Sequence, residues 1–365
     1  MDYMKQALSL AKLALGQVSP NPAVGAVVVK DGEVVGQGYT QPPGSWHAEV
    51  MALNQAGEKA RGGELYVTLE PCSHYGRTPP CTKAIITAGI SEVHMAMLDP
   101  NPLVCGQGEN ELEREDIKTH VGEHQDEAKQ INESYIKYIT TGVPFITAKF
   151  AVSLDGKIAT EDGDSKWISG NEARNYSHYL RYTTDAIMVG ANTIIDDDPH
   201  LTCRYGGKGG TAKKQPLRVI IDGKGRVPST AQVFKELGDV LIVVGDVVES
   251  EKKKALKRVG AELLELPSDK GLVDLERLLK ILGEREVTSV LVEGGGILLG
   301  SLFDRGLVDK VIAVIAPMII GGSNAKTPVA GKGVEKVMDA IQLEGLSMEM
   351  YGKDLLVSGY VAKKE

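Results

Sequence analysis

Residues 68–81 read TLEPCSHYGRTPPC and place two cysteines at the ends of one short loop. The apolar residues at 65–69 predict a buried strand that ends just before Cys72. The segment 81–88, which begins with Cys81, follows two prolines and precedes a glycine, a pattern that predicts a helix. A chain that alternates strands with helices in this way is typical of a layered α/β fold.

A histidine and a glutamate stand at the start of another predicted helix. His47-Ala48-Glu49 opens the segment 48–56. One imidazole and two thiolates, here His47, Cys72 and Cys81, match a catalytic zinc site that leaves one position to water, and the metal lowers the pKa of that water to about 7. Residues two apart turn by about 200° on a helix, so Glu49 shares this site only if the helix begins at His47. As catalytic residue, Glu49 would then carry a proton from the water to a leaving amine, as in the zinc deaminase signature H-x-E…P-C-x-x-C.

The loop between the cysteines departs from that signature. It reads SHYGRTPP where the general pattern has two residues, which weakens an interpretation as a cytidine or tRNA-adenosine deaminase. Its His74 and Arg77 suit a phosphorylated ligand. The alternative is a structural zinc in a non-enzymatic scaffold protein, with His74 as the fourth ligand.

Other histidines and cysteines give weaker signals. His120 and His124 share one face at helical spacing, but no convincing frame of cysteines or carboxylates surrounds them, and we interpret them as surface residues. Cys105 and Cys203 have no partner pattern and are expected to be ordinary packing residues.

Composition restricts the class of protein. The chain has 365 residues, which favours about two domains. Lys+Arg 41 against Asp+Glu 49 gives a net charge of −8, which disfavours nucleic acid, tRNA included, as a partner. The longest strongly apolar run, 311–320, is too short for a membrane helix, and no signal peptide is visible. Four cysteines do not make a disulfide framework, so we expect a reduced, cytoplasmic protein.

The sequence TTGVP, which ends at Pro144, predicts a boundary between domains over residues 1–143 and 144–365. In the first domain we predict further helices over 4–15 and 123–139 and further strands over 23–29, 34–38 and 93–98. In the second domain we predict strands over 145–152, 186–189, 218–221, 240–244, 289–292 and 310–315, with helices over 171–182 and 272–282.

A glycine-rich turn follows one strand of the second domain. Residues 288–296, TSVLVEGGG, form a buried-type strand that runs into glycines, and 297–302 then predicts a helix. Glycines at such a junction let backbone N–H groups approach a phosphate. The pattern is not G-x-G-x-x-G, so on its own it indicates a tight turn.

Several runs together resemble one family, the bifunctional riboflavin-biosynthesis deaminase/reductases. The run 68–81, SPNPAVG at 19–25 and DPNP at 99–102 are similar to its deaminase half. SLDGK at 153–157, DSKWIS at 164–169, VG at 189–190 with NT at 192–193, DDP at 197–199 with LTCR at 201–204, and EGGG at 293–296 are similar to its reductase half. The resemblance covers nearly the whole chain, in order.

This resemblance implies a fold, two cofactors and a set of site residues. It implies a cytidine-deaminase-like α-β-α domain with Zn²⁺, followed by a dihydrofolate-reductase-like α/β domain that uses NADPH. Pyrimidine contacts would come from Asn21 and His74 and a phosphate contact from Arg77, while Thr40 stands where the family is expected to have histidine. NADPH would contact Ala151, Trp167, Thr193, Asp197, Gly294, Gly295, Gly296, Ile297, Leu298, Leu299 and Gly300. Substrate in the second domain would contact Ser165, Arg181, Leu201, Arg204 and Glu293.

The resemblance also implies a two-step reaction on a small phosphorylated pyrimidine. The first domain would hydrolytically deaminate 2,5-diamino-6-ribosylamino-4(3H)-pyrimidinone 5′-phosphate. The second would reduce the ribosylamino group with NADPH to give 5-amino-6-ribitylaminouracil 5′-phosphate, in a protein expected to be a homo-oligomer. No second proton donor is evident for the reduction, and a water could serve. The competing interpretation is a deaminase for another base whose second domain only binds or oligomerises.

Overall fold

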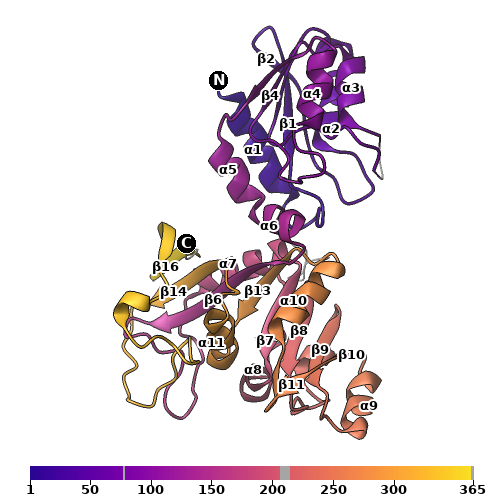
Figure 1. Cartoon of the computed structure of the whole chain (residues 1–365). Coiled ribbons are helices and arrows are strands. Elements are labelled where there is room, and N and C mark those ends of the chain that lie inside the picture. Colours follow the sequence, from indigo (N-terminus) through magenta and orange to yellow (C-terminus); the bar gives the residue numbers. More distant parts are fainter. Residues whose placement is uncertain (77–78, 206–213, 363–365) are drawn as a thin grey trace. The chain divides into compact units, whose positions relative to one another are not determined.

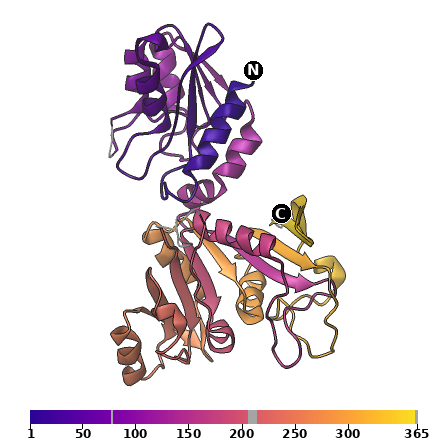
Figure 2. The ribbon, with the colours of Figure 1, turned by 180° about the vertical axis from the view of Figure 1, so that it is seen from behind.

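A computed structural model describes residues 1–76, 79–205 and 214–362. The chain divides into two units, Met1–Val143 and Pro144–Glu365 (Figures 1 and 2).

Unit 1 is a five-stranded sheet between two layers of helices. Its strand order is β2-β1-β3-β4-β5, with β3, β4 and β5 parallel and β1 antiparallel to both neighbours. Figure 1 shows α1 and α5 on one face and α2, α3 and α4 on the other. The strands are β1 (Gly25–Lys30), β2 (Glu33–Tyr39), β3 (Glu64–Val67), β4 (Glu92–Met95) and β5 (Lys118–Val121). The helices are α1 (Tyr3–Ala14), α2 (Ala48–Ala56), the 3₁₀ turn η1 (Gly57–Ala60), α3 (Cys81–Ala88), α4 (Gln107–Arg114), α5 (Gln125–Ile131) and α6 (Glu133–Thr141).

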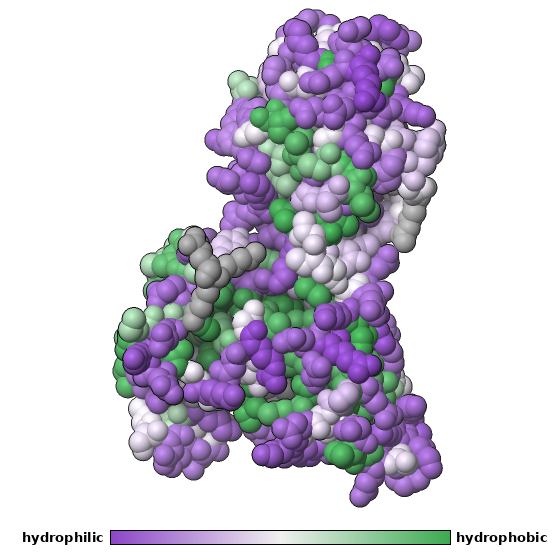
Figure 3. Space-filling model, viewed as in Figure 1, coloured by the Kyte–Doolittle hydropathy of each residue, from purple (hydrophilic) through white to green (hydrophobic). Residues whose placement is uncertain are grey.

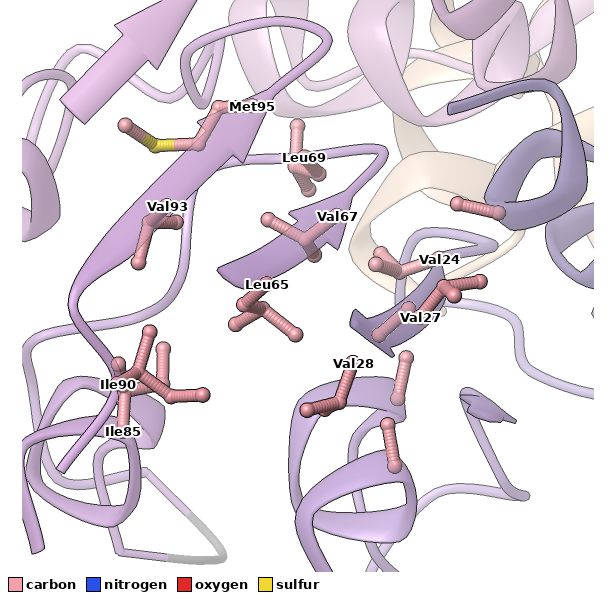
Figure 4. Packing of buried hydrophobic residues seen from close by; sticks show 14 of the residues in the cluster. Val24, Val27, Val28, Leu65, Val67, Leu69, Ile85, Ile90, Val93 and Met95 are labelled. Atoms are coloured by element: carbon pink, nitrogen blue, oxygen red, sulfur yellow. The ribbon is translucent and has the colours of Figure 1, made fainter. Parts of the chain in front are cut away.

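Small residues let helix and sheet approach closely in this unit. A Cβ on Gly25 of β1 would lie 1.9 Å from the carbonyl oxygen of Ala7 in α1, so only glycine fits there. The other face of the sheet packs into the main core of the unit. Figure 4 shows that core, in which β1, β3, β4 and α3 contribute Val28, Leu65, Val67, Val93 and Ile85.

The predicted single helix over 123–139 is wrong, because the chain breaks it at Asn132 into α5 and α6. The Asn132 side chain is buried and accepts a hydrogen bond from the backbone N–H of Ala23 (2.8 Å). Its amide also donates to the Ala23 carbonyl (3.0 Å). This long-range bridge holds Asn132 at φ −105°, ψ 20°, outside regular helix.

Unit 2 is built on a nine-stranded sheet with the order β10-β9-β8-β7-β13-β6-β14-β16-β15. Pairing is parallel from β10 to β14 and antiparallel across β14, β16 and β15. The strands are β6 (Phe145–Ser153), β7 (Ala186–Gly190), β8 (Leu217–Asp222), β9 (Val240–Gly245), β10 (Glu262–Leu266), β13 (Ser289–Glu293), β14 (Lys310–Ala316), β15 (Leu343–Tyr351) and β16 (Asp354–Val361). The helices are α7 (Asn171–Thr183), α8 (Ala191–Asp197), α9 (Ser250–Arg258), α10 (Leu275–Glu284) and α11 (Gly296–Asp304), with 3₁₀ turns η2 (Gln232–Phe234) and η3 (Val337–Asp339).

The predicted helix over 272–282 begins too early. Leu272–Val273 form the short strand β12, which pairs with β11 (Ser268–Asp269). Asp274 then caps α10, because its carboxylate accepts the backbone N–H of Arg277 at 3.0 Å.

Each buried cluster draws its residues from one unit. Figure 3 shows the surface from the side of Figure 1, where hydrophilic residues predominate and hydrophobic ones gather in patches. Within the described part of the chain, every helix is too short or too polar to cross a membrane.

Candidate functional site

Three metal-binding side chains of unit 1 converge although they come from separate segments. His47 is the N-cap of α2, Cys72 lies in the loop after β3, and Cys81 is the first residue of α3. His47 Nδ1 lies 3.6 Å from Cys72 Sγ and 3.2 Å from Cys81 Sγ. The three donor atoms lie within 4.8 Å of one another.

These separations fit one tetrahedral zinc ion. Zn–N bonds of about 2.0–2.1 Å and Zn–S bonds of about 2.3 Å place nitrogen and sulfur about 3.6 Å apart at a tetrahedral angle. In the described residues this donor cluster holds one imidazole and two thiols, and the exposed His74 is not part of it. The donor set is that of a catalytic zinc rather than a four-ligand structural zinc.

The two thiols compete for one proton. Hydrogen bonding with Cys81 and with His47 lowers the pKa of Cys72 to about 4, against the opposing effect of burial. Cys72 also accepts the backbone N–H of Cys81 at the start of α3 (3.4 Å). Hydrogen bonding to Cys72 and burial raise the pKa of Cys81. A divalent cation resolves this conflict, because it binds both sulfurs as thiolates.

Glu49 faces the same cluster from the first turn of α2. Because His47 is still extended (φ −75°, ψ 164°), the two side chains share one site despite being two residues apart. The Glu49 carboxyl is buried and is in hydrogen-bonding contact with the Cys81 thiol. Burial, with a contribution from Cys72, raises the pKa of Glu49 to about 7.

Three further residues, Asn21, Thr40 and Arg77, were considered for the first site from the sequence. Asn21 lies in the loop between α1 and β1, where its backbone N–H donates to the Val18 carbonyl (2.8 Å). Thr40 is buried and its hydroxyl bonds the backbone of Val24. Arg77 lies outside the described residues.

The carboxylate of Glu70, which was not identified from the sequence, supports the loop that carries Cys72. Glu70, two residues before Cys72, is buried and accepts four backbone N–H groups at the start of α4 and in the preceding loop. The donors are Asp99 (2.9 Å), Gly106 (2.9 Å), Gly108 (2.8 Å) and Glu109 (3.3 Å). In the sequence, the sign of this role was the acidic residue inside the run TLEPC.

The thiols outside the metal cluster differ from each other. Cys203 is buried, as expected of a packing residue, and its thiol donates to the His178 carbonyl. Cys105 is exposed, so the expectation that it packs is wrong. It lies in the turn before α4, outside any buried layer.

Unit 2 carries a cleft of about 770 Å³ at the ends of its parallel strands, a size typical of ligand sites. β13 ends at Glu293, and Gly294 and Gly295 follow at φ 82° and 84° before α11 begins. These left-handed conformations favour glycine and bring backbone into the cleft. The cleft also brings together Ala151, Ser165, Thr193, Asp197, Glu293, Gly294, Gly295, Gly296, Ile297, Leu298 and Leu299.

The remaining residues predicted for unit 2 do not line this cleft as it stands. Trp167 is 71% exposed with φ 68°, and the Arg174 guanidinium lies over its ring. Gly300 is buried, and a Cβ there would lie 2.0 Å from the Ala330 carbonyl oxygen. Leu201 is buried, whereas Arg204 is exposed.

Arg181 and Glu293 form a bidentate ion pair at the end of β13. Arg181 Nε donates to Glu293 Oε1 (2.9 Å) and an Arg181 terminal nitrogen donates to Oε2 (2.6 Å). Its other terminal nitrogen donates to the Thr202 carbonyl (2.8 Å). Burial alone would raise the pKa of Glu293, but Arg181 and Lys149 outweigh it and lower the value to about 2.

Lys149 is a cleft residue that the sequence interpretation missed. It lies on β6, paired in register with Glu293 of β13, and lines the cleft. Burial lowers its pKa, an effect that the charge of Glu293 opposes. A lysine inside the apolar strand FITAKFAV was a usable signal, because buried lysines are rare.

Family comparisons match both halves of the chain. A model of the cytidine and deoxycytidylate deaminase zinc-binding region matches residues 1–97, and a model of the RibD C-terminal domain matches residues 144–357. The riboflavin biosynthesis protein RibD of Aquifex aeolicus is 46% identical over 356 residues, which are 98% of this chain and 97% of that protein. RibD of Escherichia coli is 39% identical over 361 residues, 97% of each chain.

Solved structures agree over the whole length. Acinetobacter baumannii RibD (form 1) has a TM-score of 0.88 at 35% identity, with 99% of this chain and 98% of that chain covered. A diaminohydroxyphosphoribosylaminopyrimidine deaminase/5-amino-6-(5-phosphoribosylamino)uracil reductase from Thermotoga maritima has a TM-score of 0.85 at 37% identity, with the same coverage. The expected fold classes of both domains are thereby confirmed. Full-length identity at this level, with a deaminase zinc-binding region ahead of a RibD C-terminal domain, shows that the chain belongs to the RibD family of riboflavin biosynthesis proteins.

Proposed function

We propose that residues 1–143 deaminate 2,5-diamino-6-ribosylamino-4(3H)-pyrimidinone 5′-phosphate and that residues 144–365 reduce the product to 5-amino-6-ribitylaminouracil 5′-phosphate. The chain is a bifunctional enzyme of riboflavin biosynthesis with a zinc-dependent deaminase and an NADPH-dependent reductase activity. The observation that carries the deaminase proposal is the convergence of His47, Cys72 and Cys81 with Glu49 beside them.

In the first reaction a water replaces the 2-amino group of the pyrimidinone, and ammonia leaves. Zinc, held by His47, Cys72 and Cys81, supplies a water of lowered pKa when bound. Glu49 takes a proton from that water and delivers it to the departing amine. Its buried position next to the donor cluster, without being part of it, supports this role. Asn21 and His74 would hold the pyrimidine and Arg77 the phosphate.

For the second reaction NADPH, when bound, would supply a hydride to C1′ of the ring-opened imine form of the ribosylamino group. The imine nitrogen would take up a proton, which gives the ribitylamino side chain. Gly294, Gly295 and Gly296 would hold the cofactor, together with Ala151, Thr193, Asp197 and the α11 residues Ile297, Leu298 and Leu299. The exposed Trp167 would have to close onto the cofactor. Ser165 and Glu293 would contact the substrate, whereas the buried Gly300 and Leu201 do not line the cleft and are left out of these contacts.

The two arginines of this site take different roles in our proposal. Three of the five N–H groups of Arg181, including the Nε–Nη2 edge that would make a bidentate phosphate contact, are bound to Glu293 and Thr202, so Arg181 positions the Glu293 carboxylate. The exposed Arg204 is then the better candidate for the substrate phosphate. Lys149, opposite Glu293, is a candidate for the proton donor that the sequence did not reveal.

A coupled assay on the diaminopyrimidinone phosphate tests the proposal. We expect ammonia release without NADPH, and NADPH oxidation only after ammonia is released. If cytidine or tRNA were deaminated instead, the substrate assignment would be wrong. If ammonia were released but NADPH were never consumed, the second unit would be a binding or oligomerisation module.

We also infer that the protein is a homo-oligomer assembled through β15. This strand is the last in the nine-stranded sheet, and Leu346, Met348 and Met350 alternate along it with exposures of 54%, 64% and 64%. An edge strand with an apolar face favours pairing with another sheet edge, and a second copy offers a self-complementary one. Sedimentation analysis checks this: Met348→Glu should shift the protein toward monomer, while Glu349→Gln should not.

The thiol chemistry of the metal site also fits a reducing compartment, which supports the expected cytoplasmic location.

A further inference from the structure

The face of the unit 1 sheet that carries α1 and α5 bears two rows of polar side chains away from the Cys72–Cys81 cluster. Glu64, Glu92 and Lys118 are paired in register across β3, β4 and β5. Two residues further along each strand, and therefore on the same face, Tyr66, His94 and His120 are paired in the same way. The three rings of the second row stack: Tyr66 on His94 at 4.3 Å between ring centroids, and His94 on His120 at 4.5 Å.

His94 is the unusual member of this face. Its Nε2 atom is buried and has no hydrogen-bond partner among the described residues. It points toward two carboxylates, with Glu64 Oε2 at 3.8 Å and Glu92 Oε2 at 4.0 Å. An unpaired buried polar nitrogen carries a free-energy cost that a ligand would remove.

His120 aims at the same carboxylate oxygen. Its Nε2 lies 3.4 Å from Glu92 Oε2, and the donor atoms of Glu92, His94 and His120 lie within 4.8 Å of one another. For Zn–N and Zn–O bonds of about 2.0–2.2 Å, two ligands of one ion lie about 3.4 Å apart at a tetrahedral angle and about 4 Å apart at wider angles. Glu92 Oε2 and His120 Nε2 are already at the tetrahedral separation, whereas the 4.0 Å between Glu92 Oε2 and His94 Nε2 must shorten for all three to share one ion.

We propose that Glu92, His94 and His120 form a second divalent metal site, separate from the catalytic zinc and selective for borderline cations such as Zn²⁺. Two imidazoles with a carboxylate are a donor set for zinc, copper, iron or nickel rather than for magnesium or calcium. In the structure the two imidazole rings are nearly parallel, at 18°, so the His120 ring must tilt toward His94 to share an ion. Its side chain is 52% exposed and has room to do so.

Neighbouring groups are arranged to support such a site. Lys118 donates to Glu92 Oε1 (2.8 Å), which leaves Oε2 directed at the imidazoles. Tyr66 donates to Glu64 Oε2 (2.8 Å) and fixes a further carboxylate beside His94. A hydrogen bond from a neighbouring side chain, such as that of Lys118 to Glu92, orients a metal ligand.

A neighbouring cluster gives a matched comparison. Asp2, Glu123 and His124 also lie close enough to hold an ion, but His124 Nε2 already has a hydrogen-bonding partner in Asp2 Oδ2 at 3.0 Å. The Asp2 cluster offers one imidazole, whereas the proposed site offers two.

A metal bound at the proposed site would link β5, the short edge strand, to β4, and so should stabilise the unit.

The test is zinc stoichiometry of the zinc-loaded enzyme, measured by equilibrium dialysis against ZnCl₂ and metal analysis. Wild type should take up a second equivalent, and added zinc should raise its thermal unfolding midpoint. His120→Gln should retain only the catalytic equivalent and lose the thermal shift, whereas the control His124→Gln should behave as wild type. Because His120 is exposed, this variant should fold, and retained ammonia release would verify that. His94→Gln provides a second variant with the same expectation.

Three outcomes would overturn the site. Wild type could saturate at one equivalent, His120→Gln could keep the second, or His124→Gln could lose it. The last result would move the ion to the Asp2 cluster.

Discussion

At the scale of single residues, our proposal gives Glu49 and the zinc ligands separable roles, because Glu49 lies beside the donor cluster without belonging to it. We predict that Glu49→Gln lowers the rate of ammonia release by about 10²- to 10⁴-fold, the usual contribution of a general acid–base group. Zinc content should stay at the wild-type value in metal analysis. NADPH-dependent reduction of the deaminated compound serves as the internal control. A variant with full deaminase activity would remove Glu49 from the mechanism.

The Glu293 carboxylate gives a prediction for stability. Its pKa falls from 4.5 to about 2 on folding, so its contribution is fully present above pH 4.5 and is lost as the pH falls toward 2. Glu293→Gln leaves Arg181 buried without its partner and should cost roughly 3 to 5 kcal/mol at neutral pH. Urea unfolding of both proteins across this pH range should show the difference shrinking by about 3 kcal/mol. A difference independent of pH would contradict the ion-pair explanation.

Residue type and motif spacing predicted a cluster of His47, Cys72 and Cys81, and the structure brings these three side chains together. Residue type and spacing were not enough for Glu70 or Lys149. Their roles come from partners distant in sequence, the N–H groups around Gly108 for one and the Glu293 carboxylate for the other. His94 was missed for the same reason, since only strand register places it next to His120.

At the scale of elements, helices with one buried face and strands that are almost wholly buried were predicted well. The helices at 48–56 and 81–88 match α2 and α3, and six parallel or central strands of unit 2 fall within a residue or so of their predicted ends. Local pattern failed where a distant contact decides the structure, as at Asn132. β15 escaped prediction because its side chains are largely exposed and no buried face marks it.

One element depends on a single buried carboxylate. The N-terminus of α4 and the loop before it direct four backbone N–H groups at Glu70. Glu70→Gln replaces one acceptor oxygen with an NH₂ group that faces two of these donors, so we predict a loss of roughly 3 kcal/mol. Urea unfolding followed by Trp46 fluorescence, in a Trp167→Phe background, measures it.

The exposed Glu115→Gln, at the other end of α4, is the matched control and should change stability by less than about 0.5 kcal/mol. Equal effects of the two substitutions would mean that net charge, and not the Glu70 hydrogen bonds, stabilises this region.

At the scale of the whole molecule, the two units have separate cores and separate sites. Pro144 begins the second unit, and the strand that follows is anchored within it, since Phe145 N–H donates to the Thr288 carbonyl (2.8 Å) and Ile146 N–H to Asp309 (2.8 Å). Cutting the chain before Pro144 therefore keeps the first strand of the second sheet intact.

We predict that fragments 1–143 and 144–365 each fold and retain their own ligand. The first should bind one zinc per chain and release ammonia, and the second should bind NADPH with a dissociation constant close to that of the full chain, measured by calorimetry. Domains of this size with their own hydrophobic cores usually fold alone. NADPH binding should also be measured for the Trp167→Ala variant of the second fragment, because this variant tests whether the exposed Trp167 ring closes onto the cofactor. A folded second fragment with no NADPH binding would show that the cleft needs unit 1 to be complete, and the two activities would then be structurally coupled.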